Sequence, residues 1–207
     1  YYATKDNTIT NAFKEGLNSR GISGNMGQSD ILETFSIYAQ ESTASSEYTR
    51  ILIKFPVTGT SAGYASYDRL QGNIPASGSV SFYLRMFNAR HAQTVPKNFN
   101  LVVSAVSGAW SEGNGLDMEN YSDEEASNWV SASAAAAWIT EGGDYLENIS
   151  SSFTASFEEG FENLELDITP LVEQWIQSEG NILGTKSNYG LGVRLAYTEE
   201  AASTSYY

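Results

Sequence analysis

The sequence predicts an all-β protein, an antiparallel two-sheet β-sandwich of jelly-roll type with one short helix near the C-terminus. Short segments of alternating apolar and polar residues are separated by loops rich in Gly, Ser and Asn, which is typical of antiparallel strands. The 13 Tyr and 9 Phe favour strands, and only 4 Pro interrupt them. Helical patterns do not alternate with strands, which argues against a parallel α/β sheet.

The clearest strand in the first half runs from Ile51 to Phe55 and ends before Pro56. Its apolar row, Ile51, Ile53 and Phe55, alternates with Leu52 and Lys54, so we expect this row to face the interior. Further strands are expected at residues 80–87, where Phe82, Leu84 and Met86 share one face, and at residues 101–106.

The C-terminal part predicts a strand, a short helix and a second strand. Leu164, Leu166 and Ile168 alternate with acidic residues. A helix is expected from Pro170 to about Ser178, with Thr169 as its cap and Trp175 in the core. In the strand that follows, Leu191, Val193 and Leu195 are expected to point inward, and Arg194 outward because burying it unpaired would be costly. Asn188 and Gly190 suit a tight turn before this strand.

Length and charge limit the partners of the chain. We expect residues 1–207 to form a single domain of a longer chain. The formal net charge of −14 repels nucleic acid and anionic membranes, so we expect neither a nucleic-acid partner nor membrane insertion. No segment approaches the ~20 apolar residues that span a bilayer. The absence of cysteine excludes disulfides and thiolate chemistry.

Three tryptophans in polar surroundings are candidate sugar contacts: Trp110, Trp129 and Trp138. Flat aromatic rings at a surface can hold sugar rings by stacking. The alternative is that each ring packs in the core, because tryptophan is highly buried on average. The choice between these interpretations depends on whether the rings are exposed.

The segment 112–125 concentrates acidic residues and is expected to be a long surface loop. Its candidate metal ligands are Asp117, Glu119, Asp123 and Glu124, and the cofactor they would imply is Ca²⁺, which binds clustered carboxylates. The spacing does not follow an EF-hand. A solvated acidic loop explains the same residues and is the preferred interpretation.

No catalytic constellation is convincing, and we expect the protein not to be an enzyme. Gly59 to Gly63 matches the GxSxG pattern of a nucleophile elbow, and His91, the only histidine, lies downstream. The segment after Gly63 is too short for the helix that this motif needs, and its apolar residues do not follow a helical pattern. Small residues in a loop produce such a match by chance.

The order of several motifs resembles the DNRLRE-type β-sandwich domain, which is also grouped with carbohydrate-binding modules. The shared features are the strand at residues 50–55, the strand at residues 80–87, Trp110-Ser111-Glu112, Asp167-Ile168-Thr169, and Asn188-Tyr189-Gly190-Leu191. A proline-containing loop usual after the W-x-E step is replaced here by SNWVSAS. The stretches GNGLDMENYSDEEASNWVSAS and EEAASTSYY look most similar to structural proteins of marine tailed phages.

The resemblance implies a non-enzymatic structural or decorating module of a virus particle or of an extracellular appendage. The partners would be other structural proteins of the same assembly, and the location would be the virion or the extracellular space. The alternative function is a carbohydrate-binding module used for adhesion to a host or a polysaccharide, with glycans as partners. A polysaccharide lyase or hydrolase is a weaker third interpretation, because the chain is small for a catalytic domain in addition to a sandwich.

Overall fold

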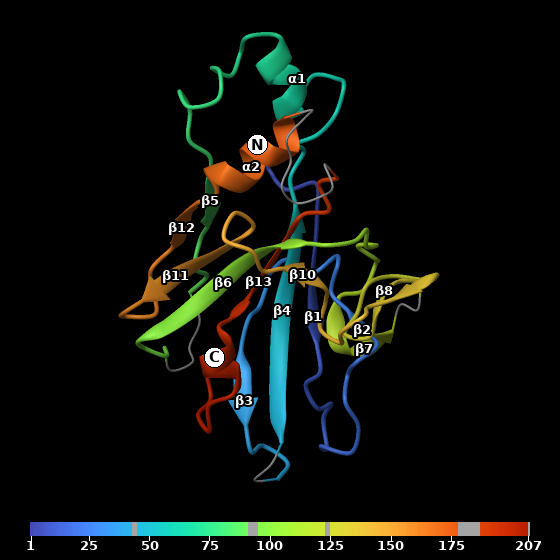
Figure 1. Ribbon diagram of the computed structural model, residues 1–207. Helices are drawn as coiled ribbons and strands as arrows, with labels where there is room; N and C mark the ends of the chain where they lie inside the picture. Colours follow the sequence, from blue (N-terminus) through green and yellow to red (C-terminus); the bar gives the residue numbers. More distant parts are fainter. Residues whose placement is uncertain (43–44, 91–94, 123–124, 178–186, 207) are drawn as a thin grey trace.

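The computed structural model shows a protein built mainly from antiparallel strands, as predicted (Figure 1). It describes residues 1–42, 45–90, 95–122, 125–177 and 187–206. The N-terminus lies near the helix α1 (Ala65–Leu70), where the hydroxyl of Tyr1 donates to Asp68, and the C-terminal end lies beside the strand β3 (Ser36–Tyr38), where Tyr206 pairs with Ser36 (Figure 1).

The elements are short, and most are strands. The strands are β1 (Lys5–Thr10), β2 (Gly24–Asn25), β3 (Ser36–Tyr38), β4 (Ser46–Lys54), β5 (Tyr83–Met86), β6 (Phe99–Val106), β7 (Asp117–Ser122), β8 (Ser131–Ser133), β9 (Ala136–Ala137), β10 (Tyr145–Leu146), β11 (Ser152–Phe157), β12 (Leu164–Asp167) and β13 (Leu191–Leu195). The helices are α1 (Ala65–Leu70), α2 (Thr169–Ile176) and α3 (Tyr197–Glu200).

Seven strands form the main sheet, in the order β1-β4-β13-β6-β10, with β11 also paired to β6 and β3 to β4. The central strands are the ones whose alternation is clearest in the sequence. In the ladder between β4 and β13, Ile53 lies opposite Leu191 and Ile51 opposite Val193. These positions are all buried, which confirms that the two apolar rows face inward.

One face of the main sheet packs against α2 and against the ribbon formed by β5 and β12. Leu84 and Leu164 of the ribbon and Leu171 and Trp175 of α2 belong to the same buried cluster as the apolar rows of β4 and β13. Trp175 is buried as predicted. This cluster is the larger of the two cores in the described part of the chain.

The opposite face of the sheet is also buried, which the sequence did not indicate. Residues 107–145 fold over it, and Leu52 packs there with Ile9, Trp110 and Trp129. Buried amides hold this layer on the sheet. Asn7 Nδ2 donates to Ser127 O at 2.8 Å, and Asn25 Nδ2 donates to the same carbonyl at 2.9 Å.

The outward orientation predicted for Arg194 is wrong, because this side chain is 2% exposed. Its guanidinium donates to Glu147, and it lies 4.3 Å from the ring centroid of Tyr197 and 5.4 Å from that of Tyr145. A carboxylate and two aromatic faces compensate in part for the loss of water around the charge, while Nε and Nη1 stay buried without a hydrogen bond to any described residue.

The helices differ from the prediction in number and in capping. Three short helices replace the single one expected, and α1 lies in the segment after Gly63 that we interpreted as non-helical. The helix α2 ends at Ile176, and the side chain of Thr169 does not cap it. Instead, Thr169 Oγ1 accepts from Phe82 N at 2.7 Å, while Asp167 Oδ1 accepts from Thr169 N at 2.9 Å.

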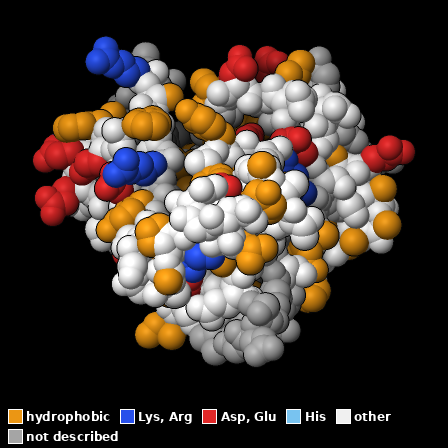
Figure 2. All heavy atoms as spheres, turned by 90° about the horizontal axis from the view of Figure 1, so that it is seen from above, with side chains coloured by type: hydrophobic (Ala, Val, Ile, Leu, Met, Phe, Trp, Pro, Cys, Tyr) orange, Lys and Arg blue, Asp and Glu red, His pale blue; other side chains and the backbone are white. Residues whose placement is uncertain are grey.

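The surface combines apolar groups with acidic ones. Figure 2 shows hydrophobic side chains in several separate groups on the face seen from above, with acidic side chains toward its edges. Within the described residues, none of the helices has the length and apolar composition needed to cross a membrane.

Candidate functional site

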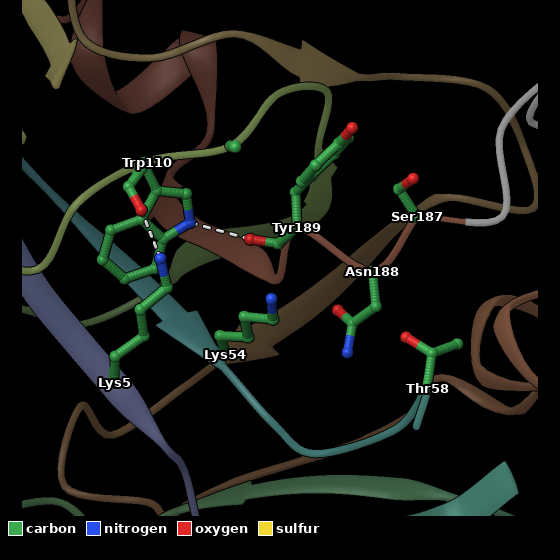
Figure 3. Close-up of a pocket in the computed structure, with 8 residues that line it drawn as sticks. Lys5, Lys54, Thr58, Trp110, Ser187, Asn188 and Tyr189 are labelled. Atoms are coloured by element: carbon green, nitrogen blue, oxygen red, sulfur yellow. Dashed lines mark hydrogen bonds between the residues drawn. The ribbon is translucent and has the colours of Figure 1, made fainter. Parts of the chain in front are cut away.

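The candidate site is a pocket of about 310 Å³ where β1, β4 and the turn before β13 meet (Figure 3). Its lining is mostly polar and comprises Lys5, Lys54, Thr58, Ala109, Trp110, Ser187, Asn188 and Tyr189. The side chains of Lys5 and Lys54 extend into the same space beside the ring of Trp110 (Figure 3). Such a volume lies at the lower end of the range for small-ligand sites.

The register of the sheet brings the two lysines together. Lys5 and Lys54 are direct partners across the antiparallel ladder of β1 and β4. Directly opposed like charges destabilise a sheet. Both side chains are partly buried, so water screens their repulsion less than it would on an open surface.

Lys5 has partners, whereas Lys54 has none among the described residues. The ammonium of Lys5 donates to the carbonyl of Trp110 and lies 3.9 Å from the centroid of the Trp110 ring. Within the described part of the chain, the ammonium of Lys54 makes no hydrogen bond or ion pair. Lys54 is therefore the donor that this pocket offers to a ligand.

Burial, followed by repulsion from Lys54, lowers the pKa of Lys5 to about 8, and Glu112 acts in the opposite direction. Glu112 lies beside β1, where its Oε1 accepts from Asp6 N at 2.7 Å. Burial, followed by repulsion from Glu112, raises the pKa of Asp6 above its usual value. The site is thus a half-buried cluster in which positive charge is only partly balanced.

The turn before β13 fixes the far wall of the pocket. Asn188 Nδ2 donates to Phe55 O at 2.7 Å, and Asn188 Oδ1 accepts from Gly190 N at 2.9 Å. Gly190 has a φ of +99°, which confirms the predicted turn. Trp110 Nε1 donates to Tyr189 O at 2.7 Å and ties this turn to the layer over the sheet.

The chemistry available in the pocket is the binding of an anion. Two ammonium groups, a buried amide and the hydroxyl of Thr58 can donate hydrogen bonds to oxygen atoms. An ammonium that binds a carboxylate forms a charge-assisted hydrogen bond, which is about twice as strong as a neutral one.

The three tryptophans predicted as sugar contacts are all buried, with exposed fractions of 4% for Trp110, 5% for Trp129 and 7% for Trp138. They pack into the second core because residues 107–145 cover the sheet. Lys5 and Arg50 also lie over the faces of Trp110 and Trp129. None of the three offers an open ring face, so the interpretation of these rings as core residues holds for all three, and the sugar contact does not.

The acidic segment contains the strand β7 where a continuous loop was expected. Asp117 Oδ1 accepts from the backbone N–H groups of Glu119 and Asn120, and Glu119 Oε1 accepts from Glu15 N. The other two candidate ligands, Asp123 and Glu124, lie outside the described residues. No group of three or more potential metal ligands occurs among the residues that are described, so a Ca²⁺ site here stays a prediction.

The GxSxG match does not form a nucleophile elbow in the described region. The strand β4 ends at Lys54 and α1 begins at Ala65, so Ser61 lies in a loop between them and not at a sharp turn that joins a strand directly to a helix. His91 lies outside the described residues.

The sequence prediction missed the lysine pocket. Lys54 was recognised only as a polar residue of its strand, and Lys5 lies in an N-terminal segment that we did not interpret as a strand. A usable signal was present: two lysines at strand ends in a chain with only 11 basic residues and a net charge of −14.

Comparison with known proteins finds no match: no family model, no curated protein and no solved structure is significantly similar to the chain. The function is therefore argued from the sequence motifs and from the geometry described above.

Proposed function

We propose that the chain is a non-enzymatic structural or decorating module of a virus particle, of the kind found in marine tailed phages, or of an extracellular appendage. The sequence resemblance supports this proposal. The observation that carries it is a pair of exposed aromatic side chains, Tyr83 and Phe87, on the ribbon of β5 and β12. The module would act in the virion or outside the cell, next to other structural proteins of the same assembly.

The ribbon has one buried face and one exposed face. Leu84 and Leu164 point into the core, whereas Tyr83 is 51% exposed and Phe87 82% exposed. Phe161, at 67% exposed, lies at the same end of the ribbon as Phe87, because Asn88 bonds to Gly160 O and to Asn163 Oδ1. Exposed apolar side chains of this size favour contact with another protein.

The edges of the ribbon support the same proposal. Within the described residues, β5 pairs only with β12, and β12 only with β5. Unpaired strand edges present free backbone groups that can pair with a neighbouring chain. Exposed aromatic side chains beside such an edge suit a contact between subunits.

The proposal also includes the arrangement of the strands in layers. We interpret the main sheet and the β5–β12 ribbon as the two layers of a reduced sandwich of jelly-roll type. The buried cluster shared by Leu84, Val103 and Val193 supports this interpretation, because it lies between the two layers. The layer of residues 107–145 would then be an addition on the outer face.

The second candidate function is a carbohydrate-binding module for adhesion. Because the three tryptophans are buried, the ribbon is now the candidate surface for the sugar contact. The exposed ring of Tyr83 lies opposite Asp167 in the ladder, next to the ion pair of Arg85 and Glu165 at 3.0 Å. An open aromatic ring flanked by polar side chains is suited to a sugar. Binding on a glycan array that is lost in Tyr83→Ala would support this function, and folded protein that binds no glycan would exclude it.

Photo-cross-linking in the native assembly tests the main proposal. A benzophenone amino acid at position 87 should cross-link to a neighbouring subunit. The same amino acid at position 139 is the matched control, because Ile139 is 94% exposed and follows Trp138, which packs on the opposite face of the main sheet. Equal yields at both positions, or no cross-link at position 87, would refute the ribbon as the contact surface.

A further inference from the structure

We propose that the pocket between Lys5 and Lys54 receives a carboxylate side chain of a neighbouring protein in the assembly. This inference rests on the proposed structural function, because it assigns the chemistry of one contact within the assembly. The occupant is an aspartate, a glutamate or a C-terminal carboxylate presented on a peptide segment.

The first argument is the pairing of the lysines. Lys5 and Lys54 lie directly opposite each other in the ladder, an arrangement that costs stability in the isolated sheet. Lys54 has no ion pair within the described residues, although the chain carries 25 acidic residues. Five of the other basic side chains do form ion pairs with carboxylates, namely Arg50, Arg69, Arg85, Lys97 and Arg194. A carboxylate from outside would remove the repulsion at this one place.

The second argument is the shape and polarity of the pocket. A volume of about 310 Å³ accommodates one side chain with its carboxylate. Asn188 and Thr58 add donors and acceptors beside the ammonium groups (Figure 3). The pKa of Lys5, which burial and repulsion from Lys54 lower to about 8, would rise again when a carboxylate binds, because the bound charge stabilises the ammonium form.

The pocket suits a carboxylate on a protein better than one on an acidic sugar. Sugar recognition uses an open aromatic face, but the ring of Trp110 is 4% exposed and the ammonium of Lys5 lies over it at 3.9 Å. A carboxylate on a flexible side chain needs only the ammonium groups. The pocket therefore favours a peptide as the carrier of the charge.

A titration followed by ¹H–¹⁵N NMR tests the proposal on the whole chain. The probe is N-acetyl-aspartate amide, and its neutral analogue is N-acetyl-asparagine amide, which has nearly the same shape. The readout is the indole signal of Trp110, assigned with Trp110→Phe. We expect saturable binding of the acidic probe with a dissociation constant on the order of 1–10 mM, and at least tenfold weaker binding of the neutral one.

Variants locate the binding. Lys54→Met should weaken binding of the acidic probe at least about tenfold, since a hydrogen bond to a charged group is lost, and Lys54→Arg should retain it. Lys97→Met is the matched control, because it removes the same charge at an exposed site and should leave binding unchanged. Unchanged signals elsewhere in each spectrum verify folding.

Each other outcome overturns the proposal. Absence of saturable binding excludes a carboxylate site, and equal binding of both probes shows that charge is not recognised. Binding that persists in Lys54→Met places the site elsewhere. Tighter binding of glucuronate than of the aspartate probe assigns the pocket to saccharides. None of these results touches the cross-linking test at position 87, so the proposed structural function stands or falls separately.

Discussion

Replacing Trp129 with alanine discriminates between a core role and a surface role for this ring. Trp129 is 5% exposed, its ring is 6.4 Å from the ring of Tyr48, and Arg50 lies over it at 5.1 Å. Removing a fully packed aromatic ring costs roughly 3–5 kcal/mol. Typical domains have only about 5–15 kcal/mol of total stability. Trp129→Ala should therefore lose a large part of the free energy of unfolding.

The assay is urea unfolding followed by far-UV circular dichroism, with thermal melting as a second measurement. For a chain of this size the loss corresponds to a decrease in Tm of about 6–20 °C. Phe87→Ala is the control, because Phe87 is 82% exposed and should change stability by less than about 0.5 kcal/mol. A Trp129→Ala protein as stable as this control would refute the second core and restore the surface platform.

Three further predictions concern single polar or backbone features. The carboxylate of Glu162 accepts from three backbone N–H groups, which lowers its pKa from 4.5 to about 2. The ionised carboxylate therefore stabilises the folded protein above pH 4.5, and this contribution is lost toward pH 2. The urea midpoints of Glu162→Gln and the parent should differ at pH 7 and converge at low pH. In the folded protein the pKa of Lys5 is about 8, below the ordinary 10.5. The buried charge of Lys5 therefore destabilises the folded state fully below pH 8, and this destabilisation decreases as the pH rises from 8 toward 10.5. The parent should therefore gain stability relative to Lys5→Met between pH 7 and pH 10, and a constant difference would contradict this. Gly190→Ala should destabilise by more than about 1 kcal/mol in urea unfolding, because a Cβ would lie 2.5 Å from Ile53 O at a φ of +99°.

The central strands could be predicted because their apolar residues alternate. The rows of β4 and β13 and the helix α2 with Trp175 lie as the sequence indicated. The arrangement of the strands in two layers was harder to predict from the sequence, because β5 and β12 form a separate two-stranded ribbon.

The second layer could not be predicted, because it is held by polar contacts between distant segments. Its strands β8 and β9 contain only two or three residues, too few to show a period. Asn7 and Asn25 hold it through hydrogen bonds to Ser127. Burial of the three tryptophans follows from this layer, whereas Arg194 is buried in contact with Glu147, Tyr145 and Tyr197.

The lysine pocket depends on strand register, which the sequence does not specify locally. The pairing of β1 with β4 determines which residue lies opposite Lys54, and many residues of the chain lie between these two strands. The turn at Asn188 and Gly190 was predictable, whereas its position against Trp110 was not.

The most direct test of the central proposal is the fractionation of the native source on a density gradient, followed by mass spectrometry of each fraction. The proposal predicts that peptides of this chain co-sediment with intact particles or filaments, in a constant ratio to a known structural protein of the assembly. Recovery of the chain only from the soluble fraction, with particles free of it, would contradict the proposal.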